Sequence, residues 1–379
     1  MKTLLSKSWV VQRGVAALFL LTTLYGASVQ AAPEYTFTDL GTLTGGNYSA
    51  AFAINNHGQI VGYSTSNSGN RAFLWQSGSM NSLGVLPGGG DSVAIDINNS
   101  GQIIGRSDSS NGSRAFLWQS GSMSNLGLLS GASGQSAANA INDAGQIAGS
   151  SSTSGGTSHA FLWQSGSMTD LGSFPNGFVD QSVGSGINSL GEVVGWSGGT
   201  DAYHSFSWQN GILTQVVVPA LAGYGDQAIA VNSAGQIVGI RYVSVGNIGV
   251  GFRAYLWQSG LTSDLGALTT NSVDEATSIN NSGQVVGFDN VGANYRAFLW
   301  DSQNGIQDLN SLVADTGGMI LQFAQDINDL GQIVGSGIYA DGATHAFLLS
   351  PIASAPTPAT LVLLAIGLTG LGLSRRKRA

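Results

Sequence analysis

The chain has 379 residues, of which 56 are glycine, none is cysteine and only 9% are charged, while 42% are hydrophobic. This composition excludes an intrinsically disordered chain, and the lack of cysteine excludes a disulfide framework and thiolate chemistry. Between the two termini six basic residues stand against all 21 acidic residues, so this part carries a net charge of −15. It lacks the clustered Lys and Arg that nucleic-acid binding requires, and we expect no nucleic-acid partner.

Residues 1–31 are typical of a secretory signal peptide. A basic start is followed by an apolar run over residues 14–25, and a small-x-small cleavage pattern ends at Ala31. A membrane anchor is the alternative, but the run is shorter than the roughly 20 residues that a span needs. We therefore predict export, with cleavage after Ala31 or Ala32.

Residues 32–350 contain seven copies of one unit, Ile/Val-Asn-x-x-Gly-Gln/Glu-Ile/Val-x-Gly, at spacings of 43 to 48 residues. The first Asn of each copy is Asn55, Asn98, Asn142, Asn188, Asn232, Asn280 or Asn328. Repeats of roughly 40–50 residues with several strands each are typical of propeller blades. Glycine in the Asn-x-x-Gly step fits a hairpin turn that needs a left-handed residue, which makes these residues structural.

The first six copies each contain four candidate strands; in the second copy they span residues 92–98, 102–105, 114–118 and 123–127. The last copy lacks a fourth strand, whereas Asp39-Leu40-Gly41 supplies one ahead of the first copy. Residues 35–41 can therefore complete the final blade and remove an open sheet edge. We predict an all-β fold: a seven-bladed β-propeller of four-stranded antiparallel blades, with its ring closed by the N-terminal strand.

Residue size varies systematically within each copy. Small residues stand four and two positions before the repeated Asn, as Ala51 and Ala53 do, and we expect them to share one face of a crowded innermost strand. Aromatic residues such as Phe73 and Trp75 fill the third strand. Their recurrence favours packing between blades over stacking on a ligand.

The segments His159–Trp163 and His345–Leu348, together with Asp170-Leu171-Gly172 and the Asn-x-x-Gly-Gln steps, resemble the HAF-type extracellular repeat family. The resemblance covers nearly the whole of the repeat region. It implies an extracellular repeat protein and brings no established reaction with it.

The sequence contains no zinc-protease, phosphate-loop or nucleophile-elbow motif. His159, His204 and His345 occupy a position that holds arginine in other copies, which indicates an exposed polar position and not a metal site. We expect no catalytic residue, no cofactor and no metal.

A few acidic residues depart from the repeat. Asp96 and Asp326 interrupt the small residues of the inner strand, Glu192 replaces the usual Gln, and Asp274-Glu275 precedes another inner strand. We take Asp96 and Asp326 as candidate ligand contacts. Because a glycosidase needs two carboxylates about 5–10 Å apart, a polysaccharide hydrolase or lyase is the alternative function. Two aspartates lining a wet channel are the simpler explanation.

Differences between the copies point to a ligand-binding face, since loops on a rigid scaffold carry function. The longest departures are residues 242–252 and 174–181. Trp196, Tyr203 and Tyr224 are aromatic residues that do not repeat, and we predict that a glycan or matrix polymer stacks on them.

Residues 351–379 form a C-terminal segment. Pro356-Thr357-Pro358 leads into an apolar run over residues 359–373, and Arg375, Arg376, Lys377 and Arg378 follow, a basic end that would stay cytoplasmic. The segment resembles the PEP-CTERM sorting signal of Gram-negative bacteria, with Thr357 where that family has Glu. The resemblance implies transient anchoring in the inner membrane, cleavage by an exosortase-like protease, and delivery to the cell surface or extracellular matrix. A plain anchor, giving a permanently anchored periplasmic binding protein, is the alternative.

Taken together, these features predict a secreted, non-enzymatic binding or structural module of the cell surface or matrix, with exopolysaccharide as its expected partner.

Overall fold

The computed structural model describes residues 34–174, 180–198, 202–220, 224–245, 249–270, 272–292 and 294–352. The predicted signal peptide, with Ala31 and Ala32, lies outside the described residues, as does the predicted sorting motif (Pro356, Thr357, Pro358, Arg375, Arg376, Lys377, Arg378). Within the described ranges, no helix is long and apolar enough to cross a membrane.

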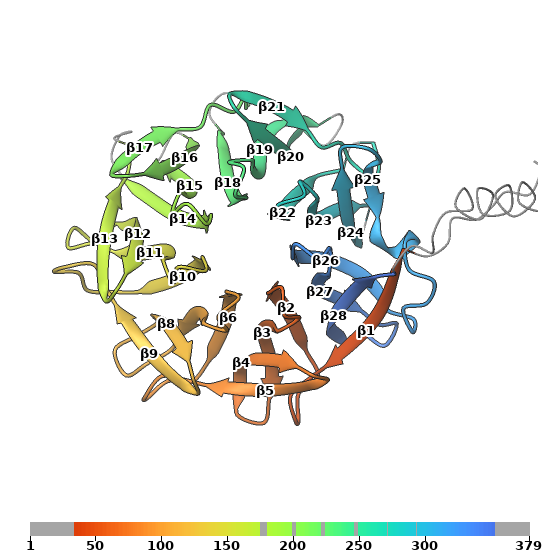
Figure 1. The fold of residues 1–379 in the computed structure, drawn as a ribbon, viewed down its shortest axis with the longest axis horizontal. Helices are drawn as coiled ribbons and strands as arrows, with labels where there is room; N and C mark the ends of the chain where they lie inside the picture. The colour runs from red at the N-terminus through yellow and green to blue at the C-terminus, as the bar shows by residue number, and fades with distance from the viewer. Residues whose placement is uncertain are drawn as a thin grey trace, which may run out of the picture. The chain divides into compact units, whose positions relative to one another are not determined.

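The described residues form seven four-stranded antiparallel sheets arranged radially as the blades of a propeller (Figure 1). Blades 1 and 2 consist of β2 (Ser49–Ile54), β3 (Ile60–Ser66), β4 (Gly69–Gln76), β5 (Ser79–Gly84), and β6 (Ser92–Ile97), β7 (Ile103–Ser107), β8 (Arg114–Gln119), β9 (Ser122–Gly127). Blades 3 and 4 consist of β10 (Ser136–Ile141), β11 (Ile147–Ser152), β12 (Ser158–Gln164), β13 (Ser167–Gly172), and β14 (Gln181–Ile187), β15 (Val193–Gly198), β16 (Tyr203–Gln209), β17 (Ile212–Gln215).

Blades 5 and 6 consist of β18 (Asp226–Val231), β19 (Ile237–Val245), β20 (Gly249–Gln258), β21 (Leu261–Asp264), and β22 (Asp274–Ile279), β23 (Val285–Val291), β24 (Asn294–Asp301), β25 (Gly305–Asp308). Blade 7 consists of β26 (Ile320–Ile327), β27 (Ile333–Ile338), β28 (Thr344–Pro351) and β1 (Tyr35–Gly41), and a 3-10 turn, η2 (Leu309–Ser311), precedes it. The predicted seven-bladed propeller is thus confirmed.

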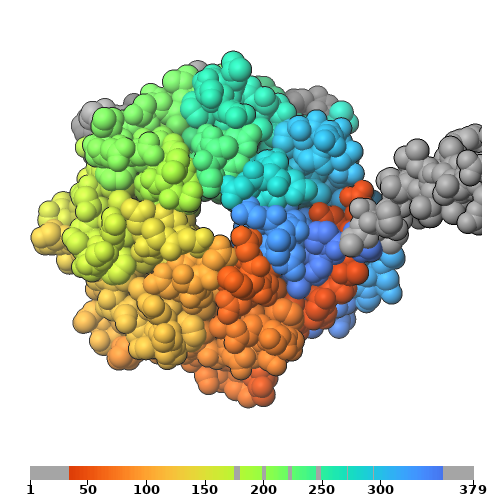
Figure 2. All heavy atoms as spheres, viewed as in Figure 1, coloured from red at the N-terminus to blue at the C-terminus, as the bar shows by residue number. Residues whose placement is uncertain are grey.

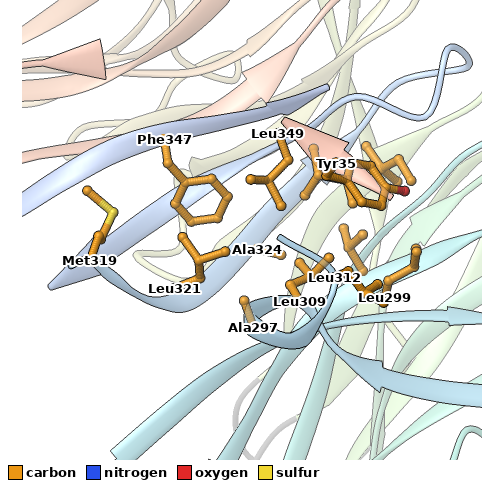
Figure 3. Close-up of a cluster of buried hydrophobic side chains, with 13 residues drawn as sticks. Tyr35, Ala297, Leu299, Leu309, Leu312, Met319, Leu321, Ala324, Phe347 and Leu349 are labelled. Atoms are coloured by element: carbon orange, nitrogen blue, oxygen red, sulfur yellow. The ribbon is translucent and has the colours of Figure 1, made fainter. Parts of the chain in front are cut away.

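The ring is closed by β1, which pairs antiparallel with β28 so that Tyr35 faces Pro351 and Asp39 faces Phe347. Figure 3 shows the core behind this closure, where Tyr35 and Leu349 pack near Leu309. The predicted closure by the N-terminal strand is therefore confirmed, and it joins segments that are about 300 residues apart in the sequence.

The aromatic ring of the third strand fills the core between adjacent blades. It is fully buried in every blade, as Phe73, Phe116, Phe161, Phe206, Tyr255, Phe298 and Phe347. In blades 1 to 6 the residue two positions further on is a Trp, for example Trp75, which is only partly buried and packs against the same clusters. In blade 7 it is Leu349, which is fully buried. Burial of these rings supplies a large part of the hydrophobic free energy of folding.

The innermost strand contains a β-bulge in all seven blades, between Ala51 and Ala53 in blade 1 and at the equivalent positions elsewhere. The bulge corrects the expectation that Ala51 and Ala53 share a face: Ala51 is completely buried, whereas Ala53 lines the central channel. The adjacent strand carries glycine at this point because a Cβ at Gly62 would collide with the carbonyl oxygen of Ala50. In a bulge, two consecutive residues lie opposite a single residue of the partner strand, which breaks the period-two alternation of side chains between the two faces.

The repeated Asn side chains link the blades around the ring. Nδ2 of Asn55 donates to the carbonyl oxygen of Asn98 at 3.1 Å, and the same bond, 3.0–3.2 Å long, joins each following pair up to Asn328, which donates back to Asn55. Each Asn is buried, and its Oδ1 also accepts two backbone N–H groups of its own turn. We call the end of the ring that carries these turns the Asn end, and the opposite end the loop end.

Candidate functional site

The central channel of the propeller contains a cavity of about 460 Å³, and a hole is open at the centre of the ring in Figure 2. Because of the bulge, two consecutive residues of each innermost strand line this cavity. The first of each pair is Phe52, Ile95, Asn139, Ser185, Ile229, Thr277 or Gln325. The second is Ala53, Asp96, Ala140, Gly186, Ala230, Ser278 or Asp326. The small-residue pattern in the sequence pointed only to the second set.

The structure places both candidate aspartates in this cavity. Asp96 of blade 2 accepts the backbone N–H of Ile97 at 2.7 Å and, across the blade boundary, the N–H of Ile141 at 2.8 Å. Asp326 of blade 7 does the same with Ile327 at 2.9 Å and Ile54 at 2.8 Å. Each carboxylate therefore joins its own blade to the next.

Burial disfavours the charged form of these carboxyl groups. Desolvation and the nearby charge of Asp326 raise the pKa of Asp96 to about 7. Desolvation also raises the pKa of Asp326, against the effect of its hydrogen bonds from Ser278, Ile54 and Ile327. A carboxyl group with a pKa near neutrality can serve as a general acid, which is the feature that the hydrolase alternative requires.

Other acidic residues have separate explanations. Desolvation raises the pKa of Glu275, which also lines the cavity, and no hydrogen bond to its carboxylate is found among the described residues. Asp274, fully buried, pairs with Arg253 at 2.6 Å. Glu192 accepts from Asn188 at 2.9 Å and from Ser207 at 2.6 Å. In blade 1 the equivalent residue, Gln59, is paired with a second Gln, Gln76, in place of a serine.

The position shared by His and Arg is more buried than expected. His159 and His345 are half-buried, and Arg114 is 8% exposed, which corrects the expectation of an exposed position. His159 Nδ1 lies 2.9 Å from Asp170, and His345 Nδ1 lies 2.9 Å from Asp39. Each pair joins two neighbouring strands of one blade. No cluster of three or more potential metal-ligating side chains is found in the described ranges.

The candidate aromatic residues gather at the loop end of blades 4 and 5. The rings of Trp196 and Tyr203 meet edge to face at 4.8 Å. The ring of Tyr224, 46% exposed, lies 6.1 Å from that of Tyr242. Tyr203 also forms a backbone bridge with Gly225, so the two pairs are adjacent. None of these four residues lines the channel cavity.

A second aromatic group, which was not predicted from the sequence, lies between blades 6 and 7. Phe323 lies 5.0 Å from Phe288 and 4.8 Å from Tyr295, measured between ring centroids. Phe288 and Trp196 each follow the repeated glycine of the second strand, as Tyr63 does in blade 1. The sequence signal for this group is therefore the position after the repeated glycine, where the residue type differs from blade to blade.

No family model matches the sequence, and no curated protein matches it. Among solved structures the chain is similar to one described as "YCF48 bound to D1 peptide", with 12% identity, a TM-score of 0.48, and coverage of 86% of this chain and 99% of that chain. It is also similar to a mutant of AofleA from Arthrobotrys oligospora, with 10% identity, a TM-score of 0.36, and coverage of 75% and 92%. Similarity at this level gives no information about function.

Proposed function

We propose that the protein is an exported, non-enzymatic module that binds glycan, with exopolysaccharide of the cell surface or extracellular matrix as its partner. The observation that carries the binding role is the adjacent pairs Trp196–Tyr203 and Tyr224–Tyr242 at the loop end. Rigid aromatic side chains supply a large contact area at a low cost in conformational entropy, and a propeller holds them on a rigid scaffold.

Export and sorting are the part of the proposal that the terminal sequences support. The signal-like residues 1–31 and the resemblance of residues 351–379 to a PEP-CTERM signal favour transient anchoring in the inner membrane and cleavage by an exosortase-like protease in a Gram-negative bacterium. Cell fractionation with intact-mass measurement tests this: we expect a mature chain that lacks both segments. A full-length C-terminus would instead favour the permanently anchored form.

The binding test compares loop-end variants with a matched apolar variant. We expect Trp196→Ala and Tyr203→Ala each to raise the Kd for exopolysaccharide about two- to tenfold, since an aromatic contact contributes about 0.5–1.5 kcal/mol. Leu261→Ala is the control, because Leu261 is 76% exposed on a hairpin at the opposite end of blade 5. Unchanged binding in both loop-end variants would overturn the proposed site.

A polysaccharide hydrolase or lyase is the second candidate function, and one observation favours it: Asp96, with a pKa of about 7, shares a cavity with Asp326. Against it, each aspartate accepts two backbone N–H groups, which ties both carboxylates to the scaffold. Incubation with candidate polysaccharides distinguishes the two functions. We expect no new reducing ends and no new unsaturated ends.

A further inference from the structure

The innermost strand of each blade has a free edge toward the channel. Near the Asn end, Asn55 N–H donates to the carbonyl oxygen of Gln59, so Asn55 and Gln59 form a hydrogen-bonded pair of the hairpin. The next pair, Ile54 and Ile60, is then of the type that exchanges no bonds, and the N–H of Ile54 points away from the second strand. The same turn bond is present in all seven blades, so seven such N–H groups face inward.

Four of these seven N–H groups have an acceptor. Asp326 caps those of Ile327 and Ile54, and Asp96 caps those of Ile97 and Ile141. The capped groups belong to blades 7, 1, 2 and 3. One aspartate therefore serves two adjacent blades, its own and the next one along the chain.

The remaining three groups belong to Ile187, Val231 and Ile279 of the adjacent blades 4, 5 and 6. These blades carry Gly186, Ala230 and Ser278 where an aspartate would stand. In the described part of the chain no side chain accepts a hydrogen bond from these three N–H groups, and all three residues line the cavity. A polar backbone group without a partner costs free energy unless water or a ligand satisfies it.

Other lining residues, from blades 4, 6, 7 and 1, offer complementary groups. The side chains of Ser185, Glu275 and Gln325 line the cavity, and none has a hydrogen-bond partner among the described residues. Phe52 contributes an aromatic ring from blade 1. No Lys, Arg or His is among the lining residues, whereas three carboxyl groups are, so the cavity disfavours an anion.

We propose that the side of the channel formed by blades 4 to 6, with the neighbouring Gln325 of blade 7, is a second binding site, for a neutral polyhydroxylated ligand such as one sugar unit. Its oxygen atoms accept from the N–H groups of Ile187, Val231 and Ile279. Its hydroxyl groups donate to Glu275 and Gln325. The cavity as a whole, lined by all seven blades, has a volume of about 460 Å³, which is within the usual range for small-ligand sites.

This inference extends the proposed glycan binding to a new site, and a single substitution separates the two. Ala230→Asp places in blade 5 the residue that blades 2 and 7 have, so its carboxylate would cap the N–H groups of Val231 and Ile279. We expect it to raise the Kd for neutral monosaccharides (glucose, galactose and mannose, measured by ligand-observed NMR) at least about tenfold. It should leave the dependence of polysaccharide binding on Trp196 unchanged.

Two further variants complete the test. Ala234→Asp adds the same charge to an exposed turn of blade 5 and should leave the Kd unchanged. Ala230→Leu fills the same space without a charge and should abolish binding, which keeps the test valid if Ala230→Asp does not fold. The proposal is overturned if none of the three monosaccharides binds to the wild type, if glucuronate binds more tightly than glucose, or if Ala230→Leu binds normally.

Discussion

Blades 3 and 7 contain the same polar interaction in two different chain contexts. In blade 3, His159 and Asp170 are 11 residues apart on consecutive strands, with Gly172 N–H donating to Asp170 at 2.8 Å. In blade 7, His345 and Asp39 are 306 residues apart, with Gly41 N–H donating to Asp39 at 2.8 Å. Among the described residues, only the second pair has a further donor, the hydroxyl group of Tyr339 at 2.8 Å.

The closing blade therefore contains the same His–Asp interaction as an ordinary blade. The two blades differ in connectivity: blade 3 is one continuous segment, whereas blade 7 forms only when two segments that are distant in the sequence pair with each other. Loop-closure entropy opposes that meeting, and the contacts of β1 must offset it. Substitutions at matched positions of the two blades therefore separate the local contribution of a contact from its contribution to ring closure.

The largest effect is expected from removing β1. A chain that begins at residue 42 loses the burial of Tyr35 and Leu40 and exposes the edge of β28, so we expect loss of cooperative unfolding and concentration-dependent aggregation. Calorimetry and light scattering measure both. A chain that begins at residue 34 is the control. Cooperative unfolding of both chains at the same Tm would show that closure does not stabilise the ring.

A large and equal effect is expected from the two core phenylalanines. Phe161 and Phe347 are both fully buried, and replacing either with Ala should lower the free energy of unfolding by about 3–5 kcal/mol. Urea titration measures the loss. Because packing between blades is local, a difference much larger than about 1 kcal/mol between the two variants would mean that core contacts also depend on closure.

A smaller, unequal effect is expected from the acidic partners. Asp39→Asn should cost about 1–2 kcal/mol, because it weakens the contacts with His345 and Tyr339 across the closing strand. Asp170→Asn should cost at most about 1 kcal/mol, since Asp170 is more exposed and receives no hydrogen bond from a tyrosine in the described part of the chain. Equal losses in urea titration would contradict the special role of the closing pair.

The smallest effect is expected on the pH dependence of stability in acid. Burial raises the pKa of Asp39, but hydrogen bonds from His345, Gly41 and Tyr339 outweigh it, and the net pKa is below the ordinary value. A lowered pKa in the folded state gives stability that is complete above the ordinary aspartate pKa and is lost as pH falls through the folded value. We expect Asp39→Asn to reduce the acid dependence of Tm. An identical slope in the variant would exclude Asp39 as a source of acid sensitivity.

The sequence was sufficient to predict the fold because the same pattern of strands and turns recurs in seven copies. Spacing and turn residues identified the blades, and the position of Asp39-Leu40-Gly41 revealed the closure. The buried ring of the third strand, for example Phe73, also followed from its recurrence. These features depend on local patterns that one sequence shows directly.

The site was only half visible in the sequence. Asp96 and Asp326 were identified as departures from a small-residue pattern, but Ser185 and Gln325, which line the same cavity, were not. The period-two rule assigns them to the wrong face, because the bulge shifts the alternation by one residue. The repeated Gly62 position was a signal of the bulge, since glycine within a strand often marks one.

The ring of buried Asn side chains also constrains how such a protein can change in evolution. Each link joins two neighbouring blades, and the last link meets the first. Duplication or deletion of a single repeat would therefore alter the geometry of every link and not of one junction alone. The closed ring of Asn hydrogen bonds therefore constrains the number of repeats, while the loops, the channel wall and the aromatic positions can differ from one blade to the next.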